Sequence, residues 1–283
     1  MTLTDFGLRI EIKFANNSPV TKKVTNFGRN VEFQPAAIYH PGSASELIEI
    51  LNRHRGQEIR AVGTLHSWSP APSTTGVLVV LENLTSIEID REDEAILVTV
   101  GAGCQLKKLV KQLAGQGLAM PSLGLIDEQT VAGATATGTH GSGKNSLSHY
   151  VESVSIAHYD QQSGEAKISV VDSGQDLKAA RCSLGLMGIV VSLKFRCRHR
   201  YNIEEHARVH DTLDSVLAQE TDFPLQQFYL MPWSWRYFGH HRVETESPTS
   251  LLAPLYRAYR FCVVDFGLHV VIVSLAKLLR LAW

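Results

Sequence analysis

The chain has 283 residues, a formal net charge of −1 at pH 7 and an apolar content of 44%. This length allows two domains, or one large domain, with a sizeable core. The nearly neutral charge gives no sign of a nucleic-acid partner, and the one basic cluster, residues 194–200, is interpreted as the solvated end of a strand. The four cysteines show no C-x-x-C spacing, so we expect reduced thiols and no metal site.

The two ends of the chain suggest where the protein is found. Asp5, Arg9 and Glu11 interrupt the N-terminus, which excludes the apolar core of a secretory signal, so we expect an intracellular protein, cytoplasmic or membrane-associated. The C-terminal segment 261–283 is mostly apolar, but its longest stretch free of Asp, Glu, Lys and Arg is far below the roughly 20 residues that span a bilayer. Two interpretations stay open: a core strand or helix, or a helix on a membrane surface.

Helices and strands are mixed along the chain. The pair Ser43 and Glu46 forms an S-x-x-E capping box before a helical apolar pattern, and β-branched runs bounded by glycine predict strands. A change from basic to acidic residues near Tyr201 predicts a boundary, with a smaller unit after it. We expect helices over 45–54, 106–113 and 176–181, and strands over 59–62, 77–81, 96–100, 151–158, 166–171 and 188–196.

Two glycine-rich segments about seventy residues apart, 60–70 and 130–143, are the most informative feature of the sequence. Glycine allows a backbone to approach a diphosphate closely and to adopt positive φ, and the exposed N–H groups of such turns form an anion-binding concavity. Each segment also carries one histidine among small residues, His66 and His140. Together they predict a site for a bulky phosphorylated cofactor.

Two common nucleotide-binding motifs fit these glycines poorly. Residues 138–145 differ from the Walker A pattern because Asn145 stands where a hydroxyl that binds Mg²⁺ is required. Gly101 and Gly103 resemble the start of a dinucleotide fingerprint, but Leu106 occupies the third glycine position. We therefore favour neither an ATPase nor a Rossmann domain.

A third pattern matches far better, and its pieces lie in register over residues 30–200. They are 33–36 leading to 39–41, 63–67, 100–103, 122–124, 130–143 and 183–190. In this order the segments resemble flavoproteins of the vanillyl-alcohol oxidase type, in the branch of sugar-1,4-lactone oxidases and alditol oxidases that includes D-arabinono-1,4-lactone oxidase. The resemblance implies an α+β fold: an N-terminal extension over 1–29, a two-subdomain FAD-binding domain of the PCMH type over 30–200, and a partial substrate (cap) domain over 201–283.

The resemblance also implies which residues bind FAD. A histidine in the place of His66 often bonds covalently to the 8α carbon of the flavin in this branch, and a neutral imidazole nitrogen is a suitable nucleophile. A loop histidine that only hydrogen-bonds phosphate stays the alternative, and His140 is either a hydrogen-bond donor to the cofactor or a packed structural residue. The expected cofactor-binding residues are Gly63, Thr64, Leu65, His66, Ser67, Gly124, Val131, Gly133, Thr137, Gly138, Thr139, His140, Gly141, Gly143, Gly188 and Ile189.

The implied reaction is oxidation of a CH–OH group of a polyol or sugar-1,4-lactone, with oxygen reduced to hydrogen peroxide. Gly124 favours oxygen as the acceptor, because relatives that reduce oxygen keep a very small residue beside the flavin. Two alternatives stay open. One is a dehydrogenase that uses a quinone or cytochrome. The other, raised because the cap region ends early, is a flavin-binding module without turnover whose apolar C-terminal segment binds a membrane or partner. We assign no catalytic residue. Arg236, His240 and His241 of the cap region are polar enough to contact a polyol, but we expect surface solvation for them.

Overall fold

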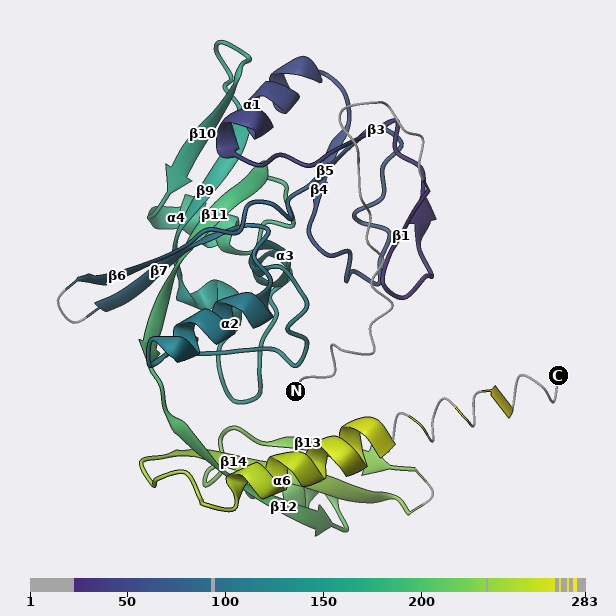
Figure 1. Cartoon of the computed structure of the whole chain (residues 1–283), viewed down its shortest axis with the longest axis vertical. Helices are drawn as coiled ribbons and strands as arrows, with labels where there is room; N and C mark the ends of the chain where they lie inside the picture. The colour runs from purple at the N-terminus through teal and green to yellow at the C-terminus, as the bar shows by residue number, and fades with distance from the viewer. Residues whose placement is uncertain are drawn as a thin grey trace. The chain divides into compact units, whose positions relative to one another are not determined.

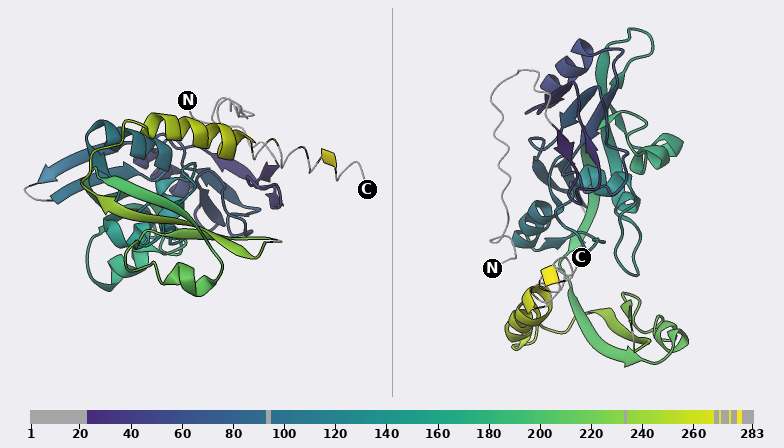
Figure 2. Two further views of the ribbon diagram at one scale, coloured as in Figure 1. Left: turned by 90° about the horizontal axis from the view of Figure 1, so that it is seen from below. Right: turned by 90° about the vertical axis from the view of Figure 1, so that its right-hand side faces the viewer.

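The computed structural model describes residues 23–92, 95–232, 234–267, 270, 274 and 277–278. The expected N-terminal extension up to residue 22 and much of the apolar segment after residue 267 therefore lie outside the described residues. By its contacts the chain divides into two compact units, Met1–Arg200 and Tyr201–Trp283. Figures 1 and 2 show the helices and strands of both units, and each unit is described by itself.

The first unit begins with a short hairpin and a small parallel sheet. Strands β1 (Val24–Thr25) and β2 (Glu32–Phe33) pair antiparallel, and the parallel sheet has the order β3 (Ala37–Tyr39), β5 (Val77–Val80), β4 (Ile59–Val62). Helix α1 (Ala44–Arg53) follows β3 and buries Leu47, Ile50 and Leu51. The predicted N-cap is confirmed, since Ser43 Oγ accepts from Glu46 N at 3.2 Å. The Glu46 side chain accepts from Gly42 N at 2.7 Å, one residue before the N–H that a capping box uses.

A larger antiparallel sheet forms the rest of the first unit, in the order β10-β9-β11-β7-β6, with β8 paired to β11. The hairpin of β6 and β7 projects from this sheet (Figures 1 and 2). Helices α2 and α3 pack on the sheet through a core that includes Leu106, Leu109, Val131 and Phe195. The elements are β6 (Ile87–Glu92), β7 (Ala95–Gly101), α2 (Leu106–Gly115), β8 (Leu118–Ala119), α3 (Val131–Ala136), η2 (Leu147–Tyr150), β9 (Val151–Tyr159), β10 (Ala166–Val171), α4 (Gly174–Arg181) and β11 (Ile189–His199).

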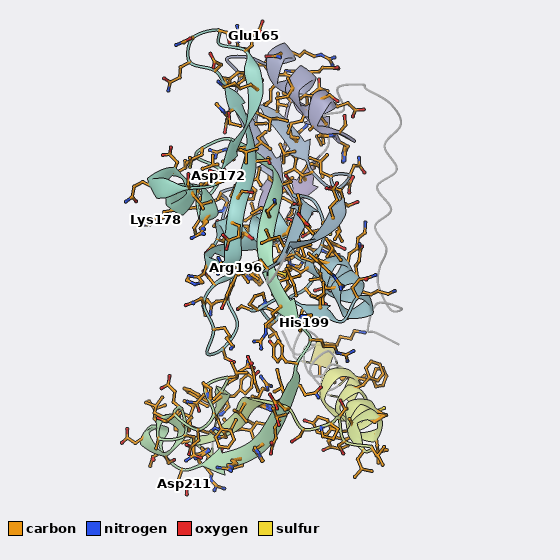
Figure 3. The ribbon with its side chains drawn as sticks, turned by 90° about the vertical axis from the view of Figure 1, so that its left-hand side faces the viewer. Glu165, Asp172, Lys178, Arg196, His199 and Asp211 are labelled. Atoms are coloured by element: carbon orange, nitrogen blue, oxygen red, sulfur yellow. The ribbon has the colours of Figure 1, made fainter. Side chains whose placement is uncertain are left out.

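The basic cluster 194–200 lies at the end of β11, as predicted. Arg196 is exposed and forms an ion pair with Glu152 of the neighbouring strand β9, and His199 ends the strand (Figure 3). The side chain of Phe195, the residue before Arg196, points instead into the core, because successive residues of a strand face opposite sides of the sheet. The cluster is therefore one solvated face of a strand.

The second unit is a three-stranded antiparallel sheet with helices. The strand order is β12 (Asn202–His210), β14 (Arg236–Thr245), β13 (Gln227–Met231). Helix α5 is Leu213–Leu217, and α6 (Ala253–Arg260) continues into a π-helical segment, Phe261–Gly267. In the described part of the chain, each helix is too short or too polar to cross a bilayer.

Candidate functional site

The first glycine-rich segment is the loop that leaves the parallel sheet after Val62. Gly63 lies against the second glycine-rich segment: a β-carbon on Gly63 would lie 2.1 Å from Thr130 Oγ1. Thr64 Oγ1 donates a hydrogen bond to the Glu128 carbonyl at 3.0 Å. The backbone of Leu65 has a φ of 55°, a value that residues other than glycine rarely adopt. The fold thus brings the two predicted segments together and holds the loop in a strained conformation.

The main-chain donors of this loop are available for a ligand. Among the described residues, the N–H groups of Thr64, Leu65 and His66 donate no hydrogen bond within the protein. Successive N–H groups that point into one concavity bind anionic groups such as a diphosphate. The loop therefore has the donors that the sequence predicted for it.

His66 is half-buried in this loop, and its Nδ1 atom is buried without a hydrogen-bond partner among the described residues. Its ring stacks on Phe27, with centroids 4.7 Å apart. Burial lowers the pKa of His66; the nearby Glu128 carboxylate opposes this shift and Lys107 adds to it. The imidazole is therefore neutral at pH 7, the form in which a ring nitrogen is a nucleophile or a hydrogen-bond acceptor.

The second glycine-rich segment contains a short helix, which the sequence did not predict. Thr130 caps α3 by accepting from Gly133 N at 3.4 Å, and Val131 is fully buried in the core. The N–H groups of Gly138 and Thr139 donate to the carbonyls of Thr135 and Ala134. The N–H groups of Gly138 and Thr139, which we expected to face the cofactor, therefore complete the end of the helix instead. The segment has correspondingly fewer main-chain donors available for a ligand.

The turn after α3 packs against residues 122–124. A β-carbon on Gly141 would lie 2.4 Å from the Leu123 carbonyl, and one on Gly124 would lie 2.7 Å from the Thr139 methyl group. Gly138 and Gly143 both have positive φ, near 68° and 63°. The turn after α3 and residues 122–124 therefore meet so closely that glycine is required on both sides.

His140 is exposed, and its Nδ1 atom lies 3.0 Å from the Gly141 carbonyl oxygen. The packed structural residue that was one alternative for His140 does not match this placement. Its imidazole lies on the surface of the turn. The other alternative, a hydrogen bond from His140 to the cofactor, stays a prediction.

The last predicted cofactor segment begins β11. Gly188 has a φ of 126°, and a β-carbon there would lie 2.5 Å from the Ala157 carbonyl, so no other residue fits. Ile189 pairs with Ala157 in the sheet. Beside this segment, the Ser183 hydroxyl is buried without a partner among the described residues, as is that of Thr135 in α3.

These observations fit a bound FAD. Buried polar groups in proteins almost always have hydrogen-bond partners, so the unpaired atoms of His66, Thr135 and Ser183 match polar groups of a ligand. Close backbone approaches at Gly63 and Gly141 leave room for nothing larger than glycine. The donors, the neutral imidazole and the glycine-lined surfaces together suit a dinucleotide cofactor with a diphosphate.

In the second unit the three polar residues singled out from the sequence, Arg236, His240 and His241, differ in burial and in their partners. Arg236 is exposed and pairs with Asp211 at 2.7 Å, and His240 lies 3.3 Å from Glu205. His241 is fully buried, and its Nε2 atom is 2.8 Å from Nε2 of His210. Surface solvation, expected for all three, is therefore wrong for His241, because the sheet of the second unit and Phe223 cover its ring.

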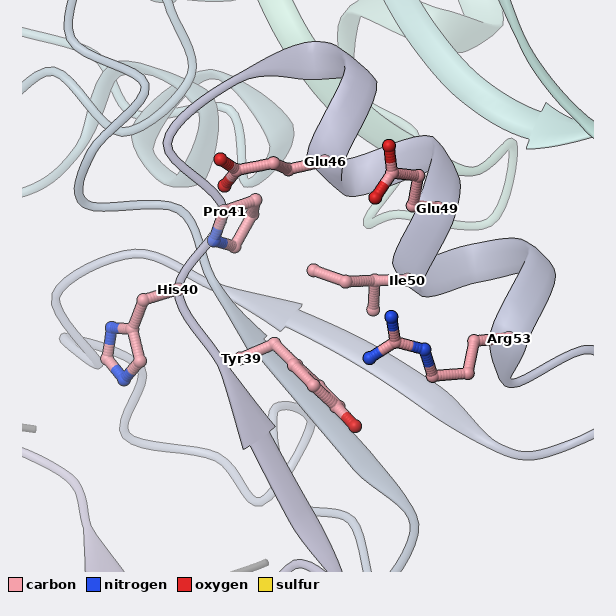
Figure 4. A pocket seen from close by; sticks show the side chains of 7 residues that line it. All are labelled: Tyr39, His40, Pro41, Glu46, Glu49, Ile50 and Arg53. Atoms are coloured by element: carbon pink, nitrogen blue, oxygen red, sulfur yellow. The ribbon is translucent and has the colours of Figure 1, made fainter. Parts of the chain in front are cut away.

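A small polar pocket lies beside α1, lined by Tyr39, His40, Pro41, Glu46, Glu49, Ile50 and Arg53 (Figure 4). Glu46 is occupied by the helix cap, and His40 Nδ1 is 2.7 Å from Glu82. Two of the side chains that line the pocket, Glu46 and His40, thus already take part in interactions that stabilise the local fold. Among the described residues, no group of three or more His, Cys, Asp or Glu side chains is arranged to hold a metal ion.

The sequence reasoning missed four residues of this site: Asn26, Phe27, Glu128 and Thr130. Phe27 and Asn26 contact the His66 loop from the N-terminal hairpin, which the resemblance did not cover. Thr130 stood inside the second segment, and its position before a small-residue run is an N-cap signal that could have identified α3. Glu128 contributes its main-chain carbonyl, for which the sequence holds no signal.

Comparison with known proteins identifies the cofactor and the kind of relatives that this chain has. Residues 35–161 match a family model described as an FAD binding domain. The chain is 49% identical over 255 residues to a long-chain alcohol oxidase of an uncultured marine euryarchaeote, covering 90% of this chain and 53% of that protein. It is 30% identical to an L-gulono-1,4-lactone dehydrogenase of Mycobacterium tuberculosis, covering 71% and 47%. It is 34% identical to D-arabinono-1,4-lactone oxidase of Kluyveromyces lactis, covering 62% and 34%.

Solved structures show the same fold. A cholesterol oxidase from Brevibacterium sterolicum superposes with a TM-score of 0.69 at 14% identity, over 80% of this chain and 48% of that one. The chain spans about half, or less, of the length of these relatives. The predicted α+β fold class is confirmed. The chain thus carries an FAD-binding domain and is homologous to the sugar-lactone oxidases and dehydrogenases, which confirms the predicted family resemblance and its cofactor, FAD.

Proposed function

We propose that the protein is an FAD-dependent oxidoreductase that oxidises a CH–OH group of a sugar-1,4-lactone or polyol, with oxygen as the acceptor and hydrogen peroxide as a product. The observation that carries this proposal is the meeting of the two glycine-rich segments around His66, whose Nδ1 atom has no protein partner among the described residues. FAD supplies the redox chemistry, accepting a hydride from the alcohol carbon, and the protein supplies position and charge.

The residues divide this work among them. The N–H groups of Thr64, Leu65 and His66 bind the diphosphate, the predicted glycines allow its close approach, and Gly188 and Ile189 approach the adenosine part. His66 Nδ1 bonds to the 8α carbon of the flavin. In this proposal residues 30–200 form the cofactor domain, and residues 201–283 form part of the substrate domain.

A long-chain alcohol is a second candidate for the substrate. The relative named a long-chain alcohol oxidase is 49% identical over 90% of this chain, whereas the L-gulono-1,4-lactone dehydrogenase is 30% identical. Both candidates share one chemistry, the transfer of a hydride from a carbon that bears a hydroxyl group. A panel containing xylitol, L-gulono-1,4-lactone and 1-dodecanol separates them.

The electron acceptor is a separate part of the proposal. Gly124 supports oxygen as the acceptor, because relatives that reduce oxygen keep a very small residue at the matching place. It packs closely against Thr139, whose methyl group would lie 2.7 Å from a β-carbon on Gly124. A quinone or cytochrome acceptor is the alternative, supported by the dehydrogenase among the relatives. Substrate-reduced protein that regains its yellow colour within seconds of mixing with air would support oxygen, and slow recovery that a quinone accelerates would support the alternative.

Anaerobic addition of each alcohol to the flavin-loaded protein tests turnover itself. Loss of the flavin absorbance with one donor, followed by peroxide release in air, is the expected result. Flavin that binds but is not bleached by any member of the panel would contradict turnover by this chain and favour a cofactor-binding module.

Membrane association is a further proposal for the C-terminal segment. Leu255, Tyr259 and Phe266 are each more than half exposed along α6 and the segment after it. Exposed apolar side chains on a helix bind the boundary between lipid headgroups and acyl chains. Co-sedimentation with phosphatidylcholine and phosphatidylglycerol vesicles is the expected result, and full recovery of the protein in the supernatant would contradict it.

A further inference from the structure

We propose that Asn26 and Phe27 are positioning residues that hold the His66 imidazole in the orientation that keeps its Nδ1 atom free of protein partners. This inference rests on the proposed attachment of the flavin to His66. It concerns the turn between β1 and β2, residues 26–31, which we call the clasp. The clasp is local in sequence, yet it contacts a loop about forty residues away.

Asn26 makes the clasp rigid. Its side chain is 3% exposed, and Oδ1 accepts hydrogen bonds from the N–H groups of Asn30 and Val31, both at 3.1 Å. Nδ2 donates to Asn30 Oδ1 at 2.7 Å and to the Ser67 carbonyl at 2.9 Å. All four hydrogen bonds that an amide side chain makes with ease are therefore used, and one of them reaches the His66 loop.

Three carbonyls of the loop are held by the clasp. Besides the bond from Asn26 to Ser67, the N–H of Phe27 donates to the Leu65 carbonyl at 3.1 Å, and Asn30 Nδ2 donates to the Trp68 carbonyl at 3.1 Å. These carbonyls lie on both sides of His66. Because Leu65 has a positive φ, a conformation with a free-energy cost, the loop needs such external contacts to keep it.

Phe27 holds the ring of His66 itself. The two rings stack with an interplanar angle of 28°, and the indole of Trp68 contacts the Phe27 ring edge to face at 4.5 Å. Gly28 makes this packing possible, because a β-carbon there would lie 2.6 Å from the Trp68 ring. One face of the imidazole is thus covered by an aromatic ring that is itself supported.

The chemistry of attachment explains why this orientation matters. The bond between Nδ1 and the 8α carbon forms through the lone pair of Nδ1, as one hydrogen leaves the 8α carbon and one leaves the other ring nitrogen, Nε2. The two electrons pass through the flavin to dioxygen, which takes up both hydrogens and becomes hydrogen peroxide. A nucleophile held in the reactive orientation gains rate because little orientational entropy remains to be lost. A mobile imidazole would attach more slowly while FAD still bound.

Four variants of the full chain separate this positioning role from a structural one. Phe27→Leu removes the stacking ring, and Phe27→Tyr keeps it. Asn26→Asp keeps both acceptor bonds but loses both donations, to Asn30 Oδ1 and to the Ser67 carbonyl. The matched control Asn83→Asp loses one donation, to the His40 carbonyl, outside the site. For each protein we would measure total bound FAD, the melting temperature, and the rate at which flavin becomes resistant to acid precipitation after FAD is added to the apoprotein.

The expected result is that Phe27→Leu and Asn26→Asp still bind FAD but attach it about five-fold more slowly or worse, whereas Phe27→Tyr and Asn83→Asp match the original protein. Equal attachment rates in all proteins would overturn the inference and leave the proposed function intact. Loss of all FAD binding in both slow variants would overturn it in favour of a structural role. An original protein that binds FAD without attaching it would refute attachment through His66, and this inference with it, while bleaching by alcohols would still test the oxidase.

Discussion

Gly63 and Thr130 lie so close that a β-carbon on Gly63 would fall 2.1 Å from the Thr130 hydroxyl oxygen. This contact joins the two glycine-rich segments, and it explains why the first needs glycine at the point where β4 ends. Thr130 cannot withdraw freely, because its hydroxyl caps α3 and its neighbour Val131 is buried in the core. The two glycine-rich segments, which we propose to form the FAD site, are therefore fixed to one another by a steric requirement.

Replacing this glycine tests the contact. Gly63→Ala forces the loop away from α3, at a cost of about 1–3 kcal/mol, and we expect FAD affinity to fall about ten-fold or more because the donors of residues 64–66 move. Gly115→Ala is the matched control, since a β-carbon there would meet nothing within 4 Å. Titration of the apoprotein with FAD, followed by flavin fluorescence, measures both. An unchanged affinity in Gly63→Ala would contradict the role of this contact.

Helix α6 is tied to the sheet of the second unit by a hydrogen bond from Tyr256 to Glu205, at 2.9 Å. Burial acts to raise the pKa of Glu205, but hydrogen bonds from Arg242 and Tyr256 outweigh it, so the pKa lies below the usual range. Tyr256→Phe removes one of these bonds, and we expect a loss of about 1 kcal/mol of stability. Tyr259→Phe, on the exposed side of the helix, serves as the control. Faster proteolysis after α6 in Tyr256→Phe alone is the expected readout, and identical rates would argue against this anchor.

The stability of the second unit should fall in mild acid. Burial of the His241 ring lowers its pKa below the usual value of 6.5, and His210, Arg208, His206 and His240 add positive charge nearby. The unfolded chain then binds a proton at a higher pH than the folded one. The stabilisation is therefore complete above pH 6.5 and is lost as the pH falls from there through the lower pKa of the folded state.

Melting temperatures between pH 8 and pH 5 test this dependence. We expect a decrease below about pH 6.5 that is smaller in His241→Gln, because the neutral amide takes up no proton in this range. His149→Gln, an exposed position of the first unit, should keep the full decrease. A pH profile that His241→Gln leaves unaltered would assign the acid sensitivity to other groups.

The cysteines should differ in reactivity. Cys104 and Cys197 are buried, and burial raises the pKa of Cys197 to about 12, whereas Cys182 and Cys262 are exposed. Because the thiolate is the reactive form, we expect iodoacetamide at pH 8 to modify Cys182 and Cys262 in the folded protein and the other two only after denaturation. Cys182 lies beside Gly138 in the turn after α3, where we propose that FAD binds, so bound FAD should slow its reaction. Peptide mass spectrometry measures each site, and rapid labelling of Cys197 would contradict the packing around β11.

Much of the first unit was predictable because its elements are local. The apolar stripe of Leu106, Leu109 and Leu113 marks α2, and the capping box marks the start of α1, with boundaries within about two residues. Strands β5 and β7 followed from β-branched runs bounded by glycine or asparagine, and β4 followed from the short apolar segment that ends at Gly63. In these segments, side-chain periodicity and local hydrogen bonds decide the structure.

The rest depended on contacts between distant residues. Helix α3 was missed because its small residues have no apolar periodicity, and it is held by the Thr130 cap and the burial of Val131. The clasp around Asn26 was missed because its partners lie about forty residues away. His241 was misplaced because its burial depends on the pairing of β12 with β14, which the charged pattern of these strands did not indicate.

The most direct test of the proposed site is the absorbance spectrum of the purified protein before and after acid precipitation, compared with that of His66→Ala. We predict flavin absorbance in both proteins, with the yellow colour remaining in the precipitate of the original protein and released into the supernatant from His66→Ala. Colour that stays with the His66→Ala precipitate would exclude His66 as the attachment point. A colourless original protein that takes up no added FAD would contradict the flavin site itself.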